Sequence, residues 1–370
     1  MNGSKRVLVF VATLGSGGVE RVAVKVCAWL RDAGHVVMLL TLSGVESDFY
    51  RCPDGVQRRG LGLQAPSRSK LGGVAANVQR WQAVRNAVIH HRAEVVLSLG
   101  DRTNVLMLLS TIGIRCRKII SERTDPALQS LSRGWNLLRR LSYPMANLHV
   151  SQSNYASAWI RARFPSLNCR VIGNSGELRQ EGAIVVRGYR EQFQFAAVGR
   201  LSHEKGIDLL LAAMALARNW TAMPFQLVVA GDGVARSALV DQVRELGLND
   251  CVTFLGRVND VGSVLRNADA FVIPSRWEGF PNAMIEAMAS GMPVIAARCR
   301  GGVVDVLDTD GEPCALDFPP GDVEALASRL VQLMEDADLR RRLSARARLR
   351  AEDFSEARIA EAWRDVVALR

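Results

Sequence analysis

Two glutamates in one short segment carry the clearest chemistry of this 370-residue chain. Residues 276–291, R-W-E-G-F-P-N-A-M-I-E-A-M-A-S-G, place Glu278 and Glu286 on either side of a Gly-Phe-Pro loop. An apolar run at 270–274 predicts a buried strand before the loop, and the Ala- and Met-rich run after it predicts a helix. Backbone N–H groups at a helix start point at an anion, whereas carboxylates accept hydrogen bonds from sugar hydroxyls. The segment therefore predicts a site for a phosphorylated sugar, or for a nucleotide with its ribose.

A second loop of the same kind carries two cations. Residues 199–206, G-R-L-S-H-E-K-G, follow an apolar run and precede a helical one. Arg200 and Lys205 can both reach one diphosphate, the arginine as a planar fork and the lysine as a point charge. The alternative is two solvated surface charges. We favour the diphosphate because both cations bracket a strand–helix loop.

A glycine loop near the start of the chain can also approach an anion. Residues 15–21, G-S-G-G-V-E-R, follow the first apolar run. Position 20 is glutamate rather than glycine, so the loop does not fit the G-x-G-x-x-G dinucleotide pattern. A lone glycine loop is a weak signal of binding, and it gains weight only beside the other two loops.

Strands and helices that position these loops alternate along both halves of the chain. Such alternation predicts parallel sheets covered by helices on both faces. We therefore predict an α/β chain of two Rossmann-like, doubly wound parallel-sheet domains, residues 1–176 and 177–370, facing a central cleft. The irregular stretch 173–194 is the expected linker, and the last helix, about 355–370, is free to pack back on the N-terminal domain. The predicted strands are 6–12, 35–42, 94–99 and 118–121 in the first half, and 195–198, 226–230, 252–254, 270–273 and 293–296 in the second.

Five motifs in fixed order resemble one protein family. They are G-G-V-E-R at 17–21, G-R-L-S-H-E-K-G at 199–206, A-G-D-G at 230–233, V-T-F-L-G-R at 252–257, and E-G-F-P-N-A-M-I-E-A-M-A-S-G-M-P-V-I at 278–295. Together they resemble the retaining glycosyltransferases of family 4, which have the GT-B fold, and in particular those acting on lipid-linked glycan precursors. Four of the five motifs lie in the second half. Expectations about the sugar donor therefore rest on more residues than those about the acceptor.

The resemblance implies roles for the charged residues of the second half. Arg200 and Lys205 would bind the donor diphosphate and neutralise the leaving group. Glu286 would accept from the ribose hydroxyls, and Glu278 would face the transferred sugar or its phosphate. The alternative for both glutamates is a helix-terminal cap. The other expected donor contacts are Gly279, Phe280 and Asn282 around the sugar and diphosphate, Gly231 and Arg257 near the base, and Gly17 and Gly18 from the other domain.

The acceptor side is less defined. Residues 121–126, S-E-R-T-D-P, end a predicted strand, and Glu122 stands near the place where many relatives carry histidine. Glu122 either acts as general base for the acceptor hydroxyl or pairs with Arg123. Glu20 and Arg21 are further acceptor-side candidates. No residue is identifiable as a covalent nucleophile, so a same-face displacement assisted by the leaving phosphate fits the resemblance better.

Charge is divided unequally between the two halves. Residues 1–175 carry 24 Lys and Arg against 9 Asp and Glu, whereas the rest carry 23 against 28. Residues 133–145, R-G-W-N-L-L-R-R-L-S-Y-P-M, form a basic amphipathic segment in which Arg133, Arg139 and Arg140 can meet an anionic membrane surface. An ordinary helix with one core face fits the same pattern. The basic half favours a membrane surface or a pyrophosphate-linked lipid acceptor.

Several classes of protein fit the sequence less well. No apolar run approaches a membrane span, and the seven scattered cysteines indicate a reduced, cytoplasmic protein without structural zinc. Asp-x-Asp occurs at 308–310 and 336–338 in polar surroundings, so we expect surface turns, no metal and no cofactor. The preferred hypothesis is a metal-independent retaining glycosyltransferase, peripheral on the inner face of the cell membrane, using a UDP-sugar and a glycan or polyprenyl-pyrophosphate-linked acceptor. The alternatives are a GT-B-fold nucleotide-sugar epimerase and a basic nucleic-acid-binding protein, the latter disfavoured by an aromatic content of only 6%.

Overall fold

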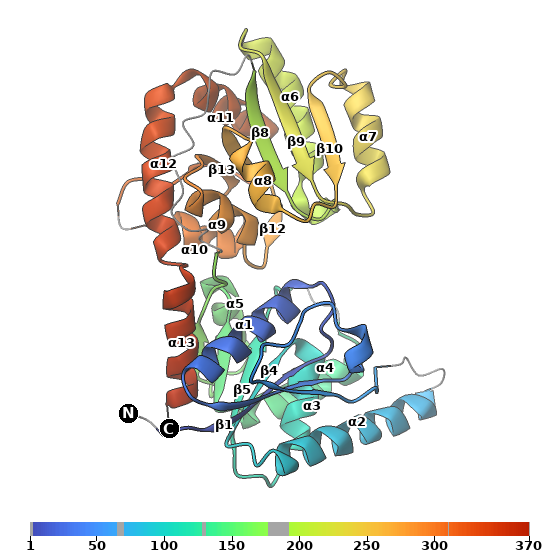
Figure 1. Cartoon of the computed structure of the whole chain (residues 1–370). Coiled ribbons are helices and arrows are strands. Elements are labelled where there is room, and N and C mark those ends of the chain that lie inside the picture. Colours follow the sequence, from blue (N-terminus) through green and yellow to red (C-terminus); the bar gives the residue numbers. More distant parts are fainter. Residues whose placement is uncertain (1–2, 65–69, 128–130, 177–191, 310, 370) are drawn as a thin grey trace. The chain divides into compact units, whose positions relative to one another are not determined.

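The computed structural model describes residues 3–64, 70–127, 131–176, 192–309 and 311–369. The chain divides into two compact units, Met1–Gly173 with Ile359–Arg370, and Asn174–Arg358 (Figure 1). Most of the expected linker at 173–194 lies outside the described residues. Each unit has its own parallel sheet and its own buried apolar side chains.

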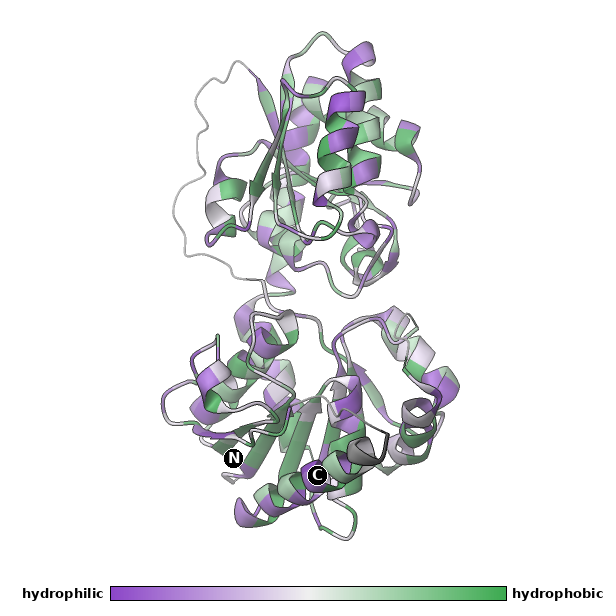
Figure 2. Cartoon of the chain, turned by 90° about the vertical axis from the view of Figure 1, so that its right-hand side faces the viewer, coloured by the Kyte–Doolittle hydropathy of each residue, from purple (hydrophilic) through white to green (hydrophobic). Residues whose placement is uncertain are grey.

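The first unit is built on a seven-stranded parallel sheet in the order β3-β2-β1-β4-β5-β6-β7. Its central strands are apolar because helices cover both faces, and Figure 2 shows them coloured mainly as hydrophobic. The strands are β1 (Arg6–Val11), β2 (Val36–Thr41), β3 (Gln57–Gly60), β4 (Val95–Leu99), β5 (Arg117–Glu122), β6 (Leu148–Ser151) and β7 (Cys169–Val171).

Alternate residues of β1 enter two separate cores. Val7 and Val9 pack with the helix after β1 and with the last helix of the chain, whose Trp363 is fully buried. Leu8 and Phe10 point to the other face. The sheet is therefore doubly wound, with helices on both sides. The helices of this unit are α1 (Gly18–Asp32), α2 (Lys70–His90), α3 (Asp101–Ser110), α4 (Arg133–Ser142), α5 (Asn154–Arg163) and α13 (Glu356–Ala368, from Ile359 on), with short 3-10 turns η1 (Val45–Ser47) and η2 (Tyr143–Met145).

The second unit has a six-stranded parallel sheet in the order β10-β9-β8-β11-β13-β15. Its strands are β8 (Phe193–Val198), β9 (Phe225–Ala230), β10 (Val252–Gly256), β11 (Ala270–Ile273), β13 (Val294–Ala297) and β15 (Leu316–Phe318), and β12 (Trp277–Glu278) pairs separately with β14 (Arg300–Gly301). The helical segments are η3 (His203–Lys205), α6 (Ile207–Trp220), α7 (Arg236–Glu245), α8 (Val261–Arg266), α9 (Asn282–Ala289), α10 (Gly302–Leu307), α11 (Val323–Glu335) and α12 (Ala337–Glu352).

The predicted α/β class, with one parallel sheet in each half, is confirmed. Both sheets reverse their strand order once, between β1 and β4 in the first unit and between β8 and β11 in the second. Ligands of open parallel sheets bind outside the carboxyl ends of the strands at such a reversal. A ligand-binding site is therefore expected at the loops that follow these four strands.

Candidate functional site

At the strand reversal of the second unit, two predicted site residues form an ion pair. Lys205 ends η3 in the loop after β8, and Glu278 lies in β12 after β11. The Nζ atom of Lys205 donates to Oε1 of Glu278 at 2.5 Å, and the Ser275 hydroxyl donates to the same oxygen at 2.8 Å. Glu278 is buried, whereas the Lys205 side chain keeps 26% of its surface exposed. The pair therefore combines a partly exposed lysine side chain with a carboxylate held in place.

The main chain brings these two loops together. Gly206 has φ +65°, and a Cβ added there would lie 2.2 Å from the carbonyl oxygen of Pro274. Only glycine allows this backbone conformation and this approach without strain. The loop after β8 is thus pressed against the loop after β11.

Arg276, for which no role was predicted, holds the same two loops together. Arg276 donates from its two Nη atoms to the two oxygens of Asp208, at 2.8 and 2.6 Å. It also donates to the carbonyl of His203 at 2.8 Å. Burial alone would raise the pKa of Asp208, but Arg276 outweighs it, so the pKa lies below its ordinary value. Arg276 opens the paired-glutamate segment, which was the available signal, but its partner Asp208 lies 68 positions away.

The start of α9 is held from several sides. The Phe280 side chain is buried, and its ring centroid lies 5.7 Å from that of Phe354. Asn282, the first residue of α9, accepts a hydrogen bond at its side-chain oxygen from the amide of Asn174 at 2.8 Å. Glu286 lies four positions further along the helix and is half-buried. Residues four apart share a helix face, so Asn282 and Glu286 lie on the same side of α9.

The remaining donor-side candidates lie on neighbouring loops of the second unit. Arg200 follows β8 and Arg257 follows β10, and both are exposed. Gly231 follows β9, where a Cβ would lie 1.8 Å from the carbonyl oxygen of Gly199. The predicted cations therefore lie at the carboxyl edge of this sheet, on the loops after β8 and β10, while Gly279 and Phe280 occupy the turn before α9.

Cations near η3 contribute to the lowered pKa of Glu204. Burial alone would raise the pKa of this carboxyl group, but the hydrogen bond from Ser202 and the neighbouring Arg200 and Lys205 reverse the effect. The pKa of Glu204 consequently lies below its ordinary value. An anion that enters this loop would meet the same two cations.

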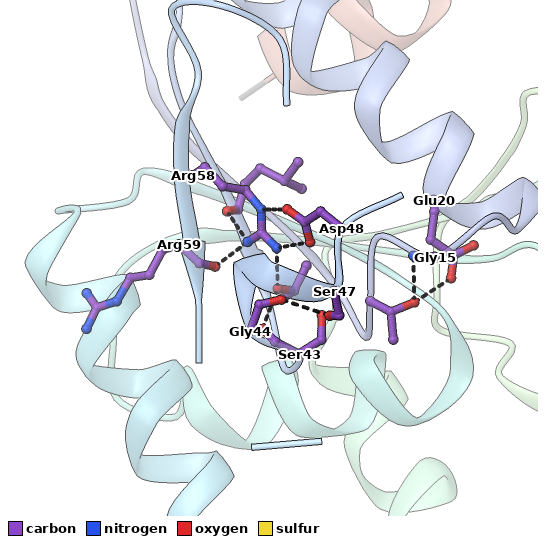
Figure 3. Close-up of polar contacts among 11 residues, drawn as sticks. Gly15, Glu20, Ser43, Gly44, Ser47, Asp48, Arg58 and Arg59 are labelled. Atoms are coloured by element: carbon purple, nitrogen blue, oxygen red, sulfur yellow. Dashed lines mark hydrogen bonds and ion pairs between the residues drawn. The ribbon is translucent and has the colours of Figure 1, made fainter. Parts of the chain in front are cut away.

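In the first unit, the predicted glycine loop joins β1 to α1. Gly17 caps α1 and Gly18 is its first residue. The Thr13 hydroxyl donates to Oε1 of Glu20 at 2.8 Å and accepts from the Gly15 amide at 3.3 Å (Figure 3). Arg21 follows in the helix and is half-buried. The Glu20 carboxylate is therefore bonded within the loop that carries it.

Glu122 forms an ion pair with Arg139. It is 1% exposed, and the Nη2 atom of Arg139 lies 2.7 and 2.8 Å from its two oxygens. The Tyr143 hydroxyl also donates to it. Burial raises the pKa of Glu122, with Arg139 and Tyr143 opposing that shift without cancelling it. Sequence reasoning missed this partner because Arg139 belongs to a helix whose charges were expected to face outward.

Helix α4 therefore corrects the expectation for Arg139. This residue is buried, with its guanidinium 4.8 Å from the Trp159 ring centroid, whereas Arg133 and Arg140 are exposed. The leucines of the helix face outward instead, because its inward face is occupied by the ion pair. Their exposed fractions are 58% for Leu137, 38% for Leu138 and 64% for Leu141.

Arg123 is buried as well, which differs from its expected place on an acceptor or membrane surface. Its Nη1 atom donates to the carbonyl of Ile172 at 3.2 Å, and its guanidinium lies 6.0 Å from the Trp363 ring centroid. Burial lowers the pKa of Arg123 to about 10. The side chain therefore joins the end of β5 to α13 inside the first unit.

Acidic pairs proposed as surface turns take part in local contacts. Asp308 accepts from Arg298 at 2.6 Å, Asp336 caps α12, and Asp338 pairs with Arg341, while residue 310 lies outside the described residues. Within the described parts of the chain, no group of three or more His, Cys, Asp or Glu is placed to hold a metal ion. Among the described helices, none combines the length and apolar character required to cross a bilayer.

Comparison with known proteins adds to this geometry. Residues 185–350 match the family model described as "Glycosyl transferases group 1". The chain is 28% identical over 370 residues to the GalNAc-α-(1→4)-GalNAc-α-(1→3)-diNAcBac-PP-undecaprenol α-1,4-N-acetyl-D-galactosaminyltransferase of Campylobacter jejuni, with 98% of each protein covered. The match therefore extends through both units.

Solved structures with the same fold cover nearly the whole chain. Sucrose-phosphate synthase from Thermosynechococcus elongatus superposes with a TM-score of 0.81 at 20% identity, covering 98% of this chain and 99% of that one. Anabaena HepE in complex with UDP-glucose superposes with a TM-score of 0.77 at 18% identity, with coverage of 98% and 99%. The chain thus has the two-domain α/β GT-B fold, and the comparisons together support glycosyltransferase activity.

Proposed function

We propose that this protein transfers a sugar from a nucleotide-diphosphate donor, with a UDP-sugar favoured, to a glycan on a lipid-linked acceptor in surface polysaccharide or glycolipid synthesis. The observation that carries the proposal is the Lys205–Glu278 pair at the strand reversal of the second unit. It lies inside the segment that matches group 1 glycosyltransferases. The undecaprenol-diphosphate substrate in the name of the Campylobacter relative supports the acceptor class, and the UDP-glucose bound to HepE supports the donor class.

In this proposal the positive groups act on the leaving diphosphate. The bond between the anomeric carbon and the diphosphate oxygen breaks, and the diphosphate keeps the electron pair. The acceptor hydroxyl forms the new bond from the same face, so configuration is retained, and it passes its proton to an oxygen of the departing diphosphate. Lys205 and Arg200 meet the charge that grows on the diphosphate, which is the point where fixed donors lower a barrier most.

Roles for the carboxylates follow from their positions. Glu278 is fixed by Lys205 and Ser275, and in the proposal it faces the transferred sugar or its phosphate. Glu286 shares its helix face with Asn282 and accepts from the ribose hydroxyls. Arg257 and Gly231, on the loops after β10 and β9, take the base.

We propose further that the reaction needs no divalent metal. Arg200 and Lys205 supply positive charge on one short loop, and that charge can neutralise a diphosphate without an ion. Transfer measured with a strong chelator would then equal transfer without it. Loss of activity on chelation, with recovery on adding Mg²⁺ or Mn²⁺, would overturn this part of the proposal.

The protein is also proposed to work at the inner face of the cell membrane, in the cytoplasm. Helix α4 supports this, because it exposes Leu137 and Leu141 together with Arg133 and Arg140. Apolar side chains bordered by cations are what an anionic bilayer surface attracts. The net charge of residues 1–175 is also positive, which favours the same anionic surface.

A donor scan tests the central proposal. Purified protein is incubated with each of several nucleotide-sugars, with and without a polyprenyl-diphosphate-linked sugar, and the released nucleotide and the glycolipid are quantified. We expect nucleotide release that depends on the acceptor and yields an α-linked product. Absence of binding and turnover for every donor would sink the proposal. Interconversion of the donor sugar without acceptor would identify an epimerase instead.

A further inference from the structure

The loop after β2 exposes an aromatic side chain beside the glycine loop of the first unit. Phe49 is 68% exposed, more than any other phenylalanine or tryptophan that the structure describes, and Trp220 follows at 48%. A single exposed apolar side chain is common on protein surfaces and needs no special account. Phe49 differs because an ion pair and main-chain hydrogen bonds fix its loop beside the glycine loop.

A two-point ion pair holds the residue before Phe49. The Nε and Nη2 atoms of Arg58 donate to the two oxygens of Asp48 at 2.8 and 2.7 Å (Figure 3). Nη2 also donates to the Thr41 hydroxyl at 2.7 Å. Both partners of the pair are largely buried, with side chains 13% and 16% exposed. Such a fork fixes direction as well as distance, so the loop is anchored to the edge of the sheet.

The main chain ties the same loop to the end of β1. The amides of Phe49 and Tyr50 both donate to the carbonyl of Leu14, at 2.8 and 3.2 Å. Leu14 directly precedes the glycine loop that begins at Gly15. The Phe49 and Tyr50 rings meet edge to face, with centroids 5.1 Å apart. The exposed Phe49 and the half-buried Tyr50 therefore lie at the carboxyl edge of the first sheet, next to its strand reversal.

Charge around Phe49 favours a neutral partner over a membrane. Residues 44–54 carry three carboxylates, Glu46, Asp48 and Asp54, against one cation, Arg51, and Arg58 neutralises Asp48, so the loop with its partner has a net charge of −1. The loop therefore lacks the excess of cations that attracts an anionic bilayer, in contrast to α4. A sugar ring instead presents C–H groups that pack on an aromatic face and hydroxyls that donate to carboxylates.

We propose that Phe49 is the stacking platform for the acceptor sugar, and that Arg58 and Asp48 are positioning residues that hold it. The proposal rests on the proposed function, because it requires a sugar acceptor. It adds the residue that recognises the sugar ring, in a part of the chain to which the sequence motifs assign nothing.

Binding without turnover provides the first test. The probe is methyl N-acetyl-α-D-galactosaminide, titrated into the full-length protein and followed by saturation-transfer NMR, with no donor present. We expect Phe49→Ala and Phe49→Leu each to weaken binding about tenfold, while Phe49→Trp and the control Trp220→Ala bind as wild type. Unchanged affinity in Phe49→Ala would overturn the platform. UDP binding is measured in parallel and is expected to be equal in all variants.

Kinetics test the positioning residues. Asp48→Asn and Arg58→Ala are expected to raise KM for the acceptor about three- to tenfold, with kcat and KM for the donor unchanged. Arg58→Lys keeps a charge but loses the fork, so only partial recovery is expected. An equal fall of kcat for every acceptor would overturn the positioning role. Failure of the proposed function looks different, since wild type would then transfer no sugar although the glycoside still binds at Phe49.

Sedimentation with vesicles distinguishes a sugar partner of Phe49 from a lipid partner. Leucine keeps the apolar surface of Phe49 but not its aromatic face. If Phe49→Leu sediments with anionic vesicles as wild type does while Phe49→Ala does not, the loop contacts lipid and the platform is wrong. Equal sedimentation of wild type and both variants supports the sugar.

Discussion

Nζ of Lys205 lies 2.5 Å from Oε1 of Glu278, although the two residues are 73 positions apart in the chain. The ammonium group is thus paired with a carboxylate of the same unit. In the proposed donor complex, the diphosphate adds two negative charges beside the Glu278 carboxylate. Donor binding would then require Lys205 and Arg200 together to outweigh Glu278. The balance of three side chains, rather than one strong cation, is therefore expected to set donor affinity.

Replacing Lys205 tests this balance. Lys205→Ala removes the ammonium group and leaves the buried Glu278 carboxylate near the proposed diphosphate position. We expect kcat/KM to fall about 10²–10³-fold, the usual cost of losing one fixed donor to a developing charge. The measurement is steady-state transfer, with UDP affinity determined by calorimetry. Lys118→Ala, in the first unit, is the control, and wild-type activity in Lys205→Ala would count against the diphosphate role.

The buried pair of Glu122 and Arg139 predicts a stability effect. Removing one partner leaves the other charge buried, so Glu122→Gln and Arg139→Met are each expected to lower the free energy of unfolding by about 3–5 kcal/mol. The double variant, with neither charge, is expected to recover most of it. Urea unfolding of the full chain measures all three. The exposed pair of Arg244 and Asp241 is the control, because Arg244→Met is expected to cost less than about 1 kcal/mol.

Transfer by the same double variant separates the two hypotheses for Glu122. If the carboxylate serves only the ion pair, activity returns together with stability. If it acts as general base, stability returns and kcat stays low. The second outcome would restore the catalytic role that the burial of Glu122 argues against.

Acid sensitivity is expected from His149. Burial lowers its pKa to about 3, and Arg139 and Arg123 act in the same direction. In the unfolded chain the imidazole takes up a proton as the pH falls through about 6.5, whereas the folded form stays neutral until about pH 3. The contribution to stability is therefore complete above about pH 6.5 and is lost progressively as the pH falls towards 3.

The size of that loss can be checked by substitution. Between pH 7 and pH 5 the wild type is expected to lose about 2 kcal/mol more than His149→Gln, which cannot take up the proton. Denaturant unfolding at a series of pH values measures the difference. The exposed His90 is the control, and His90→Gln is expected to follow wild type. Parallel curves for wild type and His149→Gln would contradict the assignment.

Membrane association is expected to depend on both kinds of exposed residue in α4. Arg133→Glu and Arg140→Glu are each expected to lower partition onto anionic vesicles at least about fivefold, since one surface cation contributes about 1 kcal/mol. Leu137→Ser with Leu141→Ser is expected to weaken binding further in vesicles of any charge. Sedimentation with vesicles measures this, and transfer to a water-soluble acceptor is expected to be unchanged.

A leucine of the other unit provides the control for α4. Leu349 in α12 is 59% exposed, close to the values in α4. Leu349→Ser is expected to leave vesicle binding unaffected. If it weakens binding as much as the α4 substitutions, exposed leucine in general, rather than α4, would account for the effect.

Much of the fold is predictable because central parallel strands are apolar on both faces. β1, β2, β9 and β11 all lie at or close to the predicted positions. β3 was not among the predicted strands, since its sequence Q-R-R-G carries two arginines at the edge of the sheet. β12 and β14 have two residues each, too few to show a pattern.

Residues of the candidate site were predictable only where a charged side chain lies on a loop that directly follows an apolar strand. Lys205 and Glu278 each follow an apolar strand, so their meeting at one sheet edge could be expected. The pair of Arg276 and Asp208 could not, because it depends on the path of two loops through space. Arg139 shows the same limit, since its helical pattern places a charge toward solvent, and only the distant Glu122 draws it inward.

The contact between Gly206 and the Pro274 carbonyl bears on how donor preference can be altered. Since main chain meets main chain there, the frame of the site does not depend on which side chains line it. A library that varies Arg200, Ser202 and Arg257 while keeping Gly206 and Pro274 is therefore expected to yield folded proteins with changed nucleotide selectivity. Randomising Gly206 itself is expected to yield mostly inactive clones, whatever the donor offered.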